Sequence, residues 1–555
     1  MQVSTPVAPS IVATQNDTNV EQQQQQELFC VCQQPYVEGQ LMVACEVCES
    51  WFHPSCIQVS NSLALSPYSL FYCKRCHSSG QYTFEDISKV RKTGRTLRKR
   101  KSIDYNSNHV LSFGDSTETL LKAGETFLQF LNSRGYKKAD VEEYIEASLD
   151  SLRSWNSFGQ TKPVLVKDSR KLQIVQEDIA IDLKLVGELV GDFCAVEVLD
   201  VATQSELYPQ WTLGQWLAYF QTPQDKRKAI LNVLSLEVSH TKLSSYIHAP
   251  ILVRDIDWIQ NSWPKTQKHS CLDELKNFFS ENVSEDQKHN RKIPLITYPK
   301  VQLYCLMSVA GAYTDFHIDF GGSSVWYHVI FGKKIFYLVR PTKKNLQAFE
   351  RWTTSPFQSC IFFGDEVDEC SWIQVAAGNT FFIPSGWIHA VYTPEDSLVF
   401  GGNYLHDFAT SKQLEIVNLE RRTGVPDKYL FPFFFKSCWY AAARIVVSYC
   451  LRYGRLEILE NILIPSYLKE LCVHCSGTDM NLDNARWKYE VDKLLKHLVS
   501  QTRHIASERW KKRNRSRIAS CLPPKEILKP SQLLDILESI CRLNLSTSSS
   551  STVVT

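Results

Sequence analysis

The sequence predicts a multidomain protein of the α+β class: a small cysteine-rich module, a β-rich domain of the barrel or jelly-roll type, and a helical C-terminal region. Three observations support this order. Seven of the 18 Cys lie within residues 28–77. Short runs rich in β-branched and aromatic residues, separated by turn residues, occupy about 163–410. After residue 411 the apolar residues recur at helical spacing.

Composition narrows the class of protein without naming it. The 555 residues include 61 Lys and Arg against 59 Asp and Glu, so the charge of the whole chain points to no partner. The N-terminus has no pattern typical of a secretory signal, which favours a reducing compartment where 18 Cys serve as metal ligands or buried thiols. The most apolar stretch, 438–451, is shorter than the roughly 18 residues of a membrane span and contains Arg444. We therefore expect a packed helix there and no membrane partner.

Composition shifts predict the order of the segments. Six β-rich runs predict barrel strands at 164–167, 195–199, 233–238, 335–339, 380–383 and 397–400. Two apolar stretches within 80–160, at 126–131 and 140–145, predict helices. The expected segments are a disordered Gln-rich N-terminus (1–27), the cysteine-rich module (28–79), a basic linker with helices (80–160), the β-rich domain (161–410, with a surface insertion at 264–299), a helical domain (411–500), and a basic segment with a Ser/Thr tail (501–555).

The cysteine-rich module contains eight soft metal ligands in four close pairs, enough for two tetrahedral zinc sites. The pairs are Cys30 and Cys32, Cys45 and Cys48, His53 and Cys56, and Cys73 and Cys76. This order, with Trp51 two residues before the His, resembles a PHD finger; a RING-type module is the alternative. The resemblance implies interleaved pairs, so that Cys30, Cys32, His53 and Cys56 hold one zinc and Cys45, Cys48, Cys73 and Cys76 hold the other.

A module of about 50 residues cannot build a sufficient core, so zinc binding would supply much of its folding free energy. A purely structural finger is therefore one reading. The other is a reader of methylated lysine, whose cation is attracted by aromatic faces. The resemblance places Phe29, Tyr36, Met42 and Trp51 at the cage positions, with Phe29 where close relatives usually have Tyr. Within the class of reader modules, a finger that binds an unmodified tail is a further alternative.

The β-rich domain contains the triplet His317-Ile318-Asp319 and, further along, His389. Two His and one carboxylate on a β-scaffold form the facial triad of non-haem Fe(II) oxygenases, and residues i and i+2 of a strand share a face. Lys334 follows His317 by 17 residues on the next expected strand and could bind the distal carboxylate of 2-oxoglutarate. Thr314 could donate a hydroxyl to the same carboxylate. These companions favour an iron site with a 2-oxoglutarate cosubstrate.

Six stretches of this domain, 304–309, 313–322, 325–328, 336–341, 383–390 and 400–403, resemble a JmjC domain. Together with the finger they resemble the PHD-finger and JmjC-domain histone lysine demethylases, the lysine demethylase 7 subfamily. The resemblance implies a double-stranded β-helix (jelly roll) core with flanking helices. It implies iron at His317, Asp319 and His389, and 2-oxoglutarate at Thr314, Lys334, Tyr327 and Leu234. The methyl-lysine pocket would be formed by Tyr304, Ile318, Trp387, Ile388 and Asn403.

The implied reaction is Fe(II)- and 2-oxoglutarate-dependent demethylation with O2 as cosubstrate. The implied substrates are mono- and dimethylated lysines of histone H3, such as lysine 9 or lysine 27, and lysine 20 of histone H4. The implied targeting is a finger that reads trimethylated lysine 4 of histone H3. Two alternatives stay open: a JmjC protein hydroxylase, and a non-catalytic chromatin reader or scaffold.

Two basic stretches lie outside the expected domains. Residues 89–101 contain eight basic residues in thirteen and read as an import signal with DNA contact, or as a solvated linker. Residues 503–517 could contact nucleosomal DNA or form a solvated helix. We expect a nuclear protein whose partners are methylated histone tails and nucleosomes. The stretch 472–475 resembles half a metal site without a matching pair, so we expect it to be structural.

Overall fold

The computed structural model describes residues 28–35, 42–45, 50–59, 69–76, 81–86, 128–129, 131–146, 161–177, 179–270, 297–356, 358, 361–476, 484–506 and 522–542. The expectations for 1–27, for the basic stretch 89–101 and for the Ser/Thr tail lie outside these residues. The chain divides into two compact units, Met1–Lys99 and Arg100–Thr555.

The first unit contains short strands around a very small core. Its strands are β1 (Leu28–Phe29), β2 (Gln34–Pro35), β3 (Val43–Ala44), β4 (Trp51–Phe52), β5 (Ser69–Tyr72) and β6 (Thr83–Asp86). They pair antiparallel as β1 with β2, β3 with β4, and β5 with β6. Among the described residues, the buried core consists of Val43, Cys45, Phe52, Ile57, Phe71 and Cys73. Two of these six are cysteines, so apolar packing alone is slight in this unit.

The second unit is built on a sheet of twelve strands, most of them antiparallel. Its strands are β7 (Lys137–Lys138), β8 (Glu142–Glu146), β9 (Val164–Asp168), β11 (Leu199–Asp200), β12 (Ser205–Glu206), β14 (Leu231–Glu237), β15 (Tyr304–Ser308), β16 (Tyr313–His317), β17 (Ser324–Val339), β18 (Ser371–Ala376), β19 (Thr380–Ile383) and β20 (Ile388–Tyr404). All six β-rich runs of the sequence contribute to strands, with 195–199 divided between β11 and β10 (Ala195–Val196), which pairs with β13 (Trp211–Thr212).

Two long strands, β17 and β20, join the halves of this sheet into a jelly roll. The first half of β20 pairs with β16, and the second half pairs with β15. The β17–β20 ladder shifts register between Val329 and Ile335, which bends both strands at the middle. The bend curls the sheet around an interior lined by its alternate side chains. The predicted jelly-roll fold is confirmed.

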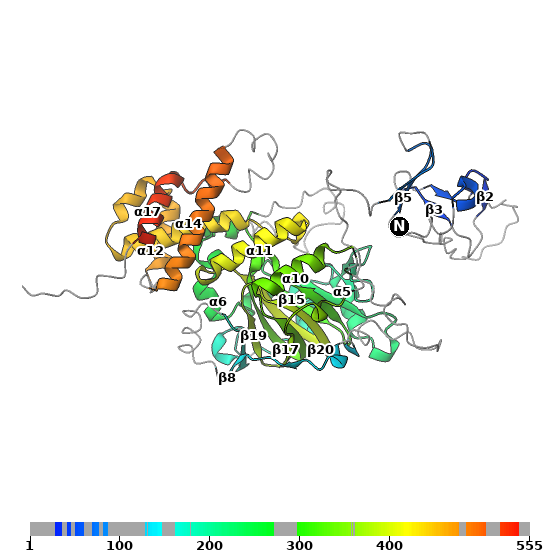
Figure 1. Ribbon diagram of the computed structural model, residues 1–555. Coiled ribbons are helices and arrows are strands. Elements are labelled where there is room, and N and C mark those ends of the chain that lie inside the picture. Colours follow the sequence, from blue (N-terminus) through cyan, green and yellow to red (C-terminus); the bar gives the residue numbers. More distant parts are fainter. Residues whose placement is uncertain are drawn as a thin grey trace, which may run out of the picture. The chain divides into compact units, whose positions relative to one another are not determined.

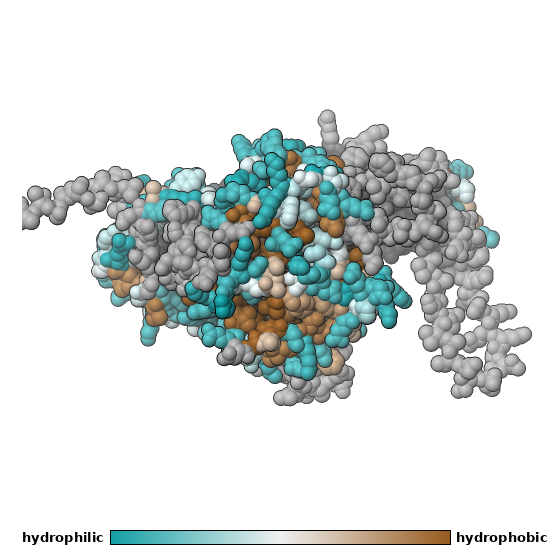
Figure 2. Space-filling view, turned by 90° about the horizontal axis from the view of Figure 1, so that it is seen from below, coloured by the Kyte–Doolittle hydropathy of each residue, from teal (hydrophilic) through white to brown (hydrophobic). Residues whose placement is uncertain are grey.

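Helices cover the outside of the jelly roll and extend its core (Figure 1). They are α4 (Leu183–Val190), α5 (Leu213–Phe220), α6 (Ile251–Ile256), α7 (Trp258–Ser262) and α10 (Lys343–Thr354). Trp216 of α5 and Trp352 of α10 are buried in the same cluster as Trp326 of β17. Seen from below, apolar residues gather near the middle of one face of this unit, with hydrophilic residues around them (Figure 2).

A second core lies among the C-terminal helices, which stand together at one side of the sheet (Figure 1). They are α11 (Thr410–Thr423), α12 (Phe434–Arg452), α13 (Pro465–Cys475), α14 (Ala485–Ala506) and α17 (Pro530–Arg542). The stretch Asp427–Arg452 is the one described helix apolar and long enough to cross a membrane, but 72% of its apolar window is buried. Its Arg444 pairs with Asp407 at 2.6 Å, so α12 is packed as expected for 438–451.

The structure corrects two expectations about secondary structure. No helix forms at 140–145: residues 142–145 lie in strand β8, which pairs in parallel with β9 at the sheet edge. Residues 501–555 are not only a basic tail: α14 continues to Ala506, and α17 buries Leu533, Leu537 and Ile540 in the helical core. The apolar residues of α17 recur at helical spacing and indicate this helix, but the basic segment before them hides the pattern in the composition of 501–555.

The predicted insertion at 264–299 is described only at its two ends. Tyr298 is 1% exposed, and Lys268 donates to the side-chain oxygen of Gln302 at 3.1 Å. Both ends therefore pack against the body of the unit, and residues 271–296 lie outside the described part of the chain. The stretch 472–475 forms the end of α13, with Cys475 buried, and belongs to no potential metal cluster among the described residues.

Candidate active site and metal clusters

The two histidines of the expected triad come from neighbouring strands. His317 ends β16 and lies opposite His389 of β20 in the register of the two strands. A bulge between Thr314 and His317 turns the end of β16 toward this position. Asp319 follows in extended conformation, with φ −61° and ψ 142°, and begins the 3-10 turn η5 (Phe320–Gly322). The chain therefore leaves the strand and still keeps the carboxylate on the side of both rings.

One ligand atom from each of His317, Asp319 and His389 lies within 4.8 Å of the other two. The two imidazole ring centres are 4.2 Å apart, and Nε2 of His389 is 3.7 Å from Oδ2 of Asp319. A divalent metal bound between them would have its ligands on one side, which leaves the opposite positions open. The three residues singled out in the sequence are therefore brought together.

Backbone carbonyls fix the orientation of both rings. Nδ1 of His317 lies 2.8 Å from the carbonyl oxygen of Asp315, and Nδ1 of His389 lies 3.3 Å from that of Trp387. Because a carbonyl only accepts, each Nδ1 carries the hydrogen and each Nε2 presents a lone pair. Nε2 of His389 is buried and has no hydrogen-bond partner in the structure. An unsatisfied buried lone pair beside a carboxylate fits a bound cation.

Burial shifts the acid–base behaviour of both His389 and Asp319 toward their uncharged forms. Burial, and next the neighbouring His317, hold the pKa of His389 well below its usual range, so its ring is neutral. Burial raises the pKa of the Asp319 carboxyl, while His317 and the Asn403 amide oppose this rise. Metal ligation needs a neutral imidazole and a carboxylate, and a divalent cation would replace the solvation that this carboxylate lacks.

A cavity of about 170 Å³ opens beside the cluster. It contains six of the predicted cosubstrate and substrate residues: Leu234, Tyr304, Thr314, Tyr327, Lys334 and Asn403. His317 and Asp319 are on its wall, so a molecule in the cavity can reach the metal position. The volume and the mixture of apolar walls with few polar groups suit a small ligand.

Lys334 is the cationic group of this cavity. It is 4% exposed, and its Nζ donates to Oγ1 of Thr393 at 2.8 Å. Burial lowers the pKa of Lys334 to about 7, and no ion pair to it occurs within the described residues. A buried ammonium without a counter-charge is costly, so the cavity is suited to receive a carboxylate at this end.

Three predicted pocket residues do not line the cavity. Ile388 is fully buried in the barrel core, and Trp387 is 6% exposed in a second apolar cluster, of which Val325 and Phe336 line the cavity. Ile318 packs against the barrel core. Successive residues of a strand point to opposite faces, so Ile318 and Ile388, each next to a ligand histidine, point away from the metal position. All three pack in apolar clusters of the jelly roll, and their assignment to the methyl-lysine pocket stays a prediction.

Several cavity residues were not predicted, although their spacing from predicted site residues indicates them. Val391 and Thr393 follow His389 at even spacing on β20, and Asn232 precedes Leu234 by two on β14. Even spacing on a strand places side chains on one face. Phe320 was not deducible in this way, because it enters the cavity wall from the η5 turn after the strand.

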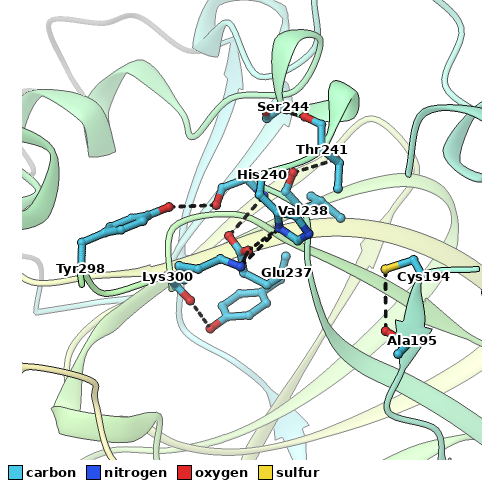
Figure 3. A network of polar contacts seen from close by, with 11 residues as sticks. Cys194, Ala195, Glu237, Val238, His240, Thr241, Ser244, Tyr298 and Lys300 are labelled. Atoms are coloured by element: carbon cyan, nitrogen blue, oxygen red, sulfur yellow. Dashed lines mark hydrogen bonds and ion pairs between the residues drawn. The ribbon is translucent and has the colours of Figure 1, made fainter. Parts of the chain in front are cut away.

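A buried polar network stands beside Tyr304 of the cavity wall, and Figure 3 shows its members Glu237, His240 and Lys300. The Tyr304 hydroxyl donates to the carbonyl oxygen of Lys300 at 3.1 Å, and Nζ of Lys300 lies 2.7 Å from Oε2 of Glu237. His240 completes the group, with Nδ1 3.2 Å from the Lys300 ammonium. Burial would raise the pKa of Glu237, but the hydrogen bond from His240 and the charge of Lys300 bring it below its usual range. Glu237 is therefore a carboxylate that anchors the chain entering β15.

The first unit contains two further clusters. Cys30, Cys32, His53 and Cys56 approach one another within 4.8 Å, and so do Cys45, Cys73 and Cys76. Nδ1 of His53 is 3.3 Å from Sγ of Cys32 and 3.8 Å from Sγ of Cys56. Cys48, the fourth member expected in the second cluster, lies outside the described residues. The clusters interleave along the chain as the PHD resemblance implies, and thiolates with one imidazole suit zinc.

The predicted aromatic cage is only partly described. Trp51 lies half-buried on β4, and Met42 is 2% exposed. The side chain of Phe29 and the whole of Tyr36 lie outside the described residues. Of the two described members, Trp51 therefore offers accessible ring surface, whereas Met42 is buried.

Comparison with known proteins agrees with both units. Residues 30–76 match the PHD-finger family. The chain is 34% identical over 443 residues to lysine-specific demethylase 7B of Danio rerio, an alignment that covers 80% of this chain and 68% of that protein. It is 44% identical over 308 residues to lysine-specific demethylase 2A of Xenopus tropicalis, covering 56% of this chain and 25% of that protein. A third relative, histone lysine demethylase PHF8 of Danio rerio, is 35% identical over 434 residues.

A finger with interleaved thiolate clusters, joined to a jelly roll that gathers two His and one Asp beside a buried lysine, defines a protein of the PHD-finger and JmjC-domain class. The chain belongs to the lysine demethylase 7 family of this class. It spans from about a quarter to about two thirds of the length of the relatives named above.

Proposed function

We propose that this chain is an Fe(II)- and 2-oxoglutarate-dependent histone lysine demethylase. The observation that carries the proposal is the unsatisfied, buried Nε2 of His389, which faces Asp319 and His317 at the wall of a cavity whose Lys334 has no ion pair to any described residue. One end of this cavity suits a divalent metal and the other suits a carboxylate. The relatives support the reaction class, because they are named as lysine-specific demethylases.

Each residue has a role in this proposal. His317, Asp319 and His389 would hold Fe(II), with the two histidines kept in the ligating tautomer by the carbonyls of Asp315 and Trp387. Lys334 would pair with the distal carboxylate of 2-oxoglutarate. Thr314, Tyr327 and Leu234 would form the walls around that cosubstrate. Tyr304 and Asn403 would face the methylated lysine.

When bound, iron with 2-oxoglutarate and O2 supplies the oxidation that hydroxylates an N-methyl group, which then leaves as formaldehyde. The chain's own contribution is to position the reactants and to exclude water. The apolar side chains Leu234, Val325 and Phe336 line the cavity and keep it dry. Asn403 donates to Oδ1 of Asp319 at 3.3 Å and fixes the carboxylate next to the substrate side.

The finger would select the chromatin on which the reaction occurs. We propose that it binds trimethylated lysine 4 of histone H3 through Trp51 and the aromatic residues near it, and that two zinc ions hold its fold. Anchoring at one lysine raises the effective concentration of nearby lysines at the active site. The proposed substrates are mono- and dimethylated lysine 9 or lysine 27 of histone H3, and lysine 20 of histone H4.

Nuclear localisation and nucleosome contact follow from such a substrate. The basic stretch 89–101 and the segment 503–517 are the candidates for import and for non-specific DNA contact. Of the second segment the structure describes only residues 503–506, which end α14.

Mass spectrometry on a panel of methylated histone peptides tests the proposal. Each peptide is offered with and without trimethylated lysine 4, in the presence of Fe(II), 2-oxoglutarate and O2. We expect loss of methyl groups and release of formaldehyde with the wild-type chain, and neither with His317→Ala. The matched control is His248→Ala, an exposed histidine away from the cavity, which should retain activity.

The same assay separates the alternatives. A stable hydroxylated peptide without formaldehyde would support a protein hydroxylase. Binding of a methylated peptide without conversion of 2-oxoglutarate would support a non-catalytic reader. Demethylation that persists in His317→Ala would contradict the iron assignment.

A further inference from the structure

Helix α11 of the C-terminal helical core contacts the loop that follows Asp319. Oε1 of Glu420 accepts a hydrogen bond from the backbone N–H of Gly321 at 2.7 Å. Glu420 lies in the last turn of α11 and is 7% exposed. Gly321 is two residues after the predicted metal ligand, inside η5. A side chain from the helical region thus holds the backbone next to the active-site carboxylate.

The same helix crowds both loops that carry the ligands. At Gly322, which follows Asp319 by three residues, a Cβ atom would lie 2.8 Å from Cβ of Ile416 on α11. At Gly386, which precedes His389 by three, a Cβ atom would lie 2.8 Å from the side chain of Lys412, also on α11. Both glycines have positive φ, 60° and 77°. Only glycine lets the two loops pass this close to the helix.

Hydrogen bonds connect the Asp319 loop and the His389 loop to each other beneath α11. Oγ of Ser385 donates to the carbonyl oxygen of Gly322. Asn403 donates to Oγ of Ser323 at 2.9 Å and to Oδ1 of Asp319 at 3.3 Å. The Asp319 loop, the His389 loop and β20 therefore form one bonded layer, and α11 packs against its outer side.

We propose that α11 is a brace for the metal site, and that Glu420 is the positioning residue through which the helical region sets the Asp319 loop. This inference rests on the proposed function, because it assigns the cluster of His317, Asp319 and His389 to a metal. It assigns to the C-terminal helices a role in metal affinity, beyond packing. Residues that orient metal ligands from the next layer typically change affinity by about 10–100-fold when removed.

Glu420 positions the Asp319 loop through its hydrogen-bond acceptor, and not through the charge of its carboxylate. No ion pair to Glu420 occurs within the described residues. Burial raises the pKa of this carboxyl to about 7, and the Gly321 N–H opposes the rise. A protonated carboxyl still has a carbonyl oxygen that accepts, and so has an amide. An amide of the same size should therefore replace Glu420, whereas an apolar side chain of the same length should not.

The test measures Mn(II) affinity of the full-length chain by titration calorimetry, with zinc supplied to the finger and without 2-oxoglutarate. The matched variants are Glu420→Gln, which keeps the acceptor, and Glu420→Met, which keeps the length and loses it. We expect Mn(II) binding within about 3-fold of wild type for Gln and about 10–100-fold weaker for Met. Glu415→Gln is the control, an exposed carboxylate on the same helix that pairs with Lys412, and it should match wild type.

Equal Mn(II) affinity for Glu420→Met and wild type would overturn the proposal, and so would equal weakening in both variants. If Glu420→Met does not fold, hydrogen exchange decides: the Gly321 amide must be protected in wild type and in Glu420→Gln, and rapid exchange in wild type overturns the proposal. Binding that is lost in His389→Ala identifies the site. A chain that binds Mn(II) there but removes no methyl group would contradict the proposed function and leave the brace standing.

Discussion

The finger and the jelly roll place metal ligands in opposite relations to their cores. In the finger, the described core is six residues and its strands are two to four residues long. In the jelly roll, β17 and β20 have 16 and 17 residues, and the core forms without using any of His317, Asp319 or His389. We infer that zinc would take the place of a large core in the first unit, whereas in the second a complete core would present the metal site.

The metal ligands of the finger and of the jelly roll also differ in type and in number. The described finger ligands are mainly cysteines from loops between short strands, four in one cluster and three in the other. With the predicted Cys48, each zinc would have four ligands and a closed coordination shell. The jelly-roll cluster offers three ligands beside a cavity of about 170 Å³, which leaves room for other molecules on the metal. We therefore expect substitutions in the finger to act on folding and substitutions in the jelly roll to act on binding and turnover.

The largest effect should follow from Cys45→Ala. Cys45 is 1% exposed, and zinc binding contributes on the order of 10 kcal/mol to the folding of such fingers. We expect the finger to unfold in the intact chain while the jelly roll keeps its melting temperature. Hydrogen exchange resolved by peptide mass spectrometry measures both at once. Slow exchange in residues 42–76 of the variant would remove the distinction between the two units.

The next effect should be loss of Fe(II) or Mn(II) binding in His389→Ala. A direct ligand is worth more than the residues that orient it, so we expect affinity to fall by more than about 100-fold, with the fold retained. The control is His328→Ala, a buried histidine of β17 that bonds Thr380 at 2.9 Å. That change should cost stability, about 1–3 kcal/mol, and leave metal affinity unchanged. Titration calorimetry and thermal melting separate the two results, and the opposite pattern would contradict the comparison.

A smaller effect is expected from Lys334→Met, which keeps the length and removes the charge. Loss of one partner of a buried ion pair costs about 2–4 kcal/mol, so 2-oxoglutarate should bind about 30–1000-fold more weakly. Metal affinity should be unchanged, because Lys334 bonds Thr393 and not the ligands. A variant that binds 2-oxoglutarate as wild type does would place the cosubstrate elsewhere.

Lys334 also predicts a pH dependence. Burial lowers its pKa to about 7 from the usual lysine value of 10.5, so between these two values the unfolded chain binds a proton that the folded chain lacks. The contribution of Lys334 to the free energy of unfolding therefore rises with pH between about 7 and 10.5. Binding of 2-oxoglutarate favours the ammonium form, so it should take up a proton above pH 7 in wild type and not in Lys334→Met. Calorimetry in buffers of different ionisation enthalpy measures this uptake.

The smallest effect should come from Tyr304→Phe, which removes the hydroxyl that donates to the Lys300 carbonyl. A single hydrogen bond contributes about 0.5–1.5 kcal/mol, so we expect KM for the methylated peptide to rise about 2–12-fold. KM for 2-oxoglutarate should not change. A change in 2-oxoglutarate binding alone would mean that Tyr304 belongs to the cosubstrate end of the cavity.

Much of the site was predictable because metal ligation demands particular residue types at short spacing. His317 and Asp319 are two residues apart, and each cysteine pair of the finger is separated by one or two residues. Lys334 was found because a cosubstrate carboxylate needs a cation on a neighbouring strand. The helix expected at 140–145 was wrong because a five-residue strand at a sheet edge is decided by its partner β9, which local periodicity does not contain.

The predicted methyl-lysine pocket shows a second limit of predicting the site from the sequence. The resemblance implies Ile318, Trp387 and Ile388 in that pocket, but none of them lines the cavity, and alternation along the strands turns Ile318 and Ile388 toward the packed core. Thr393 and Asn232 were reachable by counting even positions from His389 and Leu234. Phe320 and Glu420 were not, since one enters from a turn and the other from a helix about 100 residues later.

By itself the sequence determined the chemistry: which side chains can bind a metal, and which folds can present them. These properties depend on residue type and on spacing of a few positions, which are local. Only the tertiary structure decided which side chains share the cavity, that Lys334 has no counter-charge among the described residues, and that α11 packs on both ligand loops. Those facts depend on burial and on contacts between distant segments, and burial is a property of the whole fold.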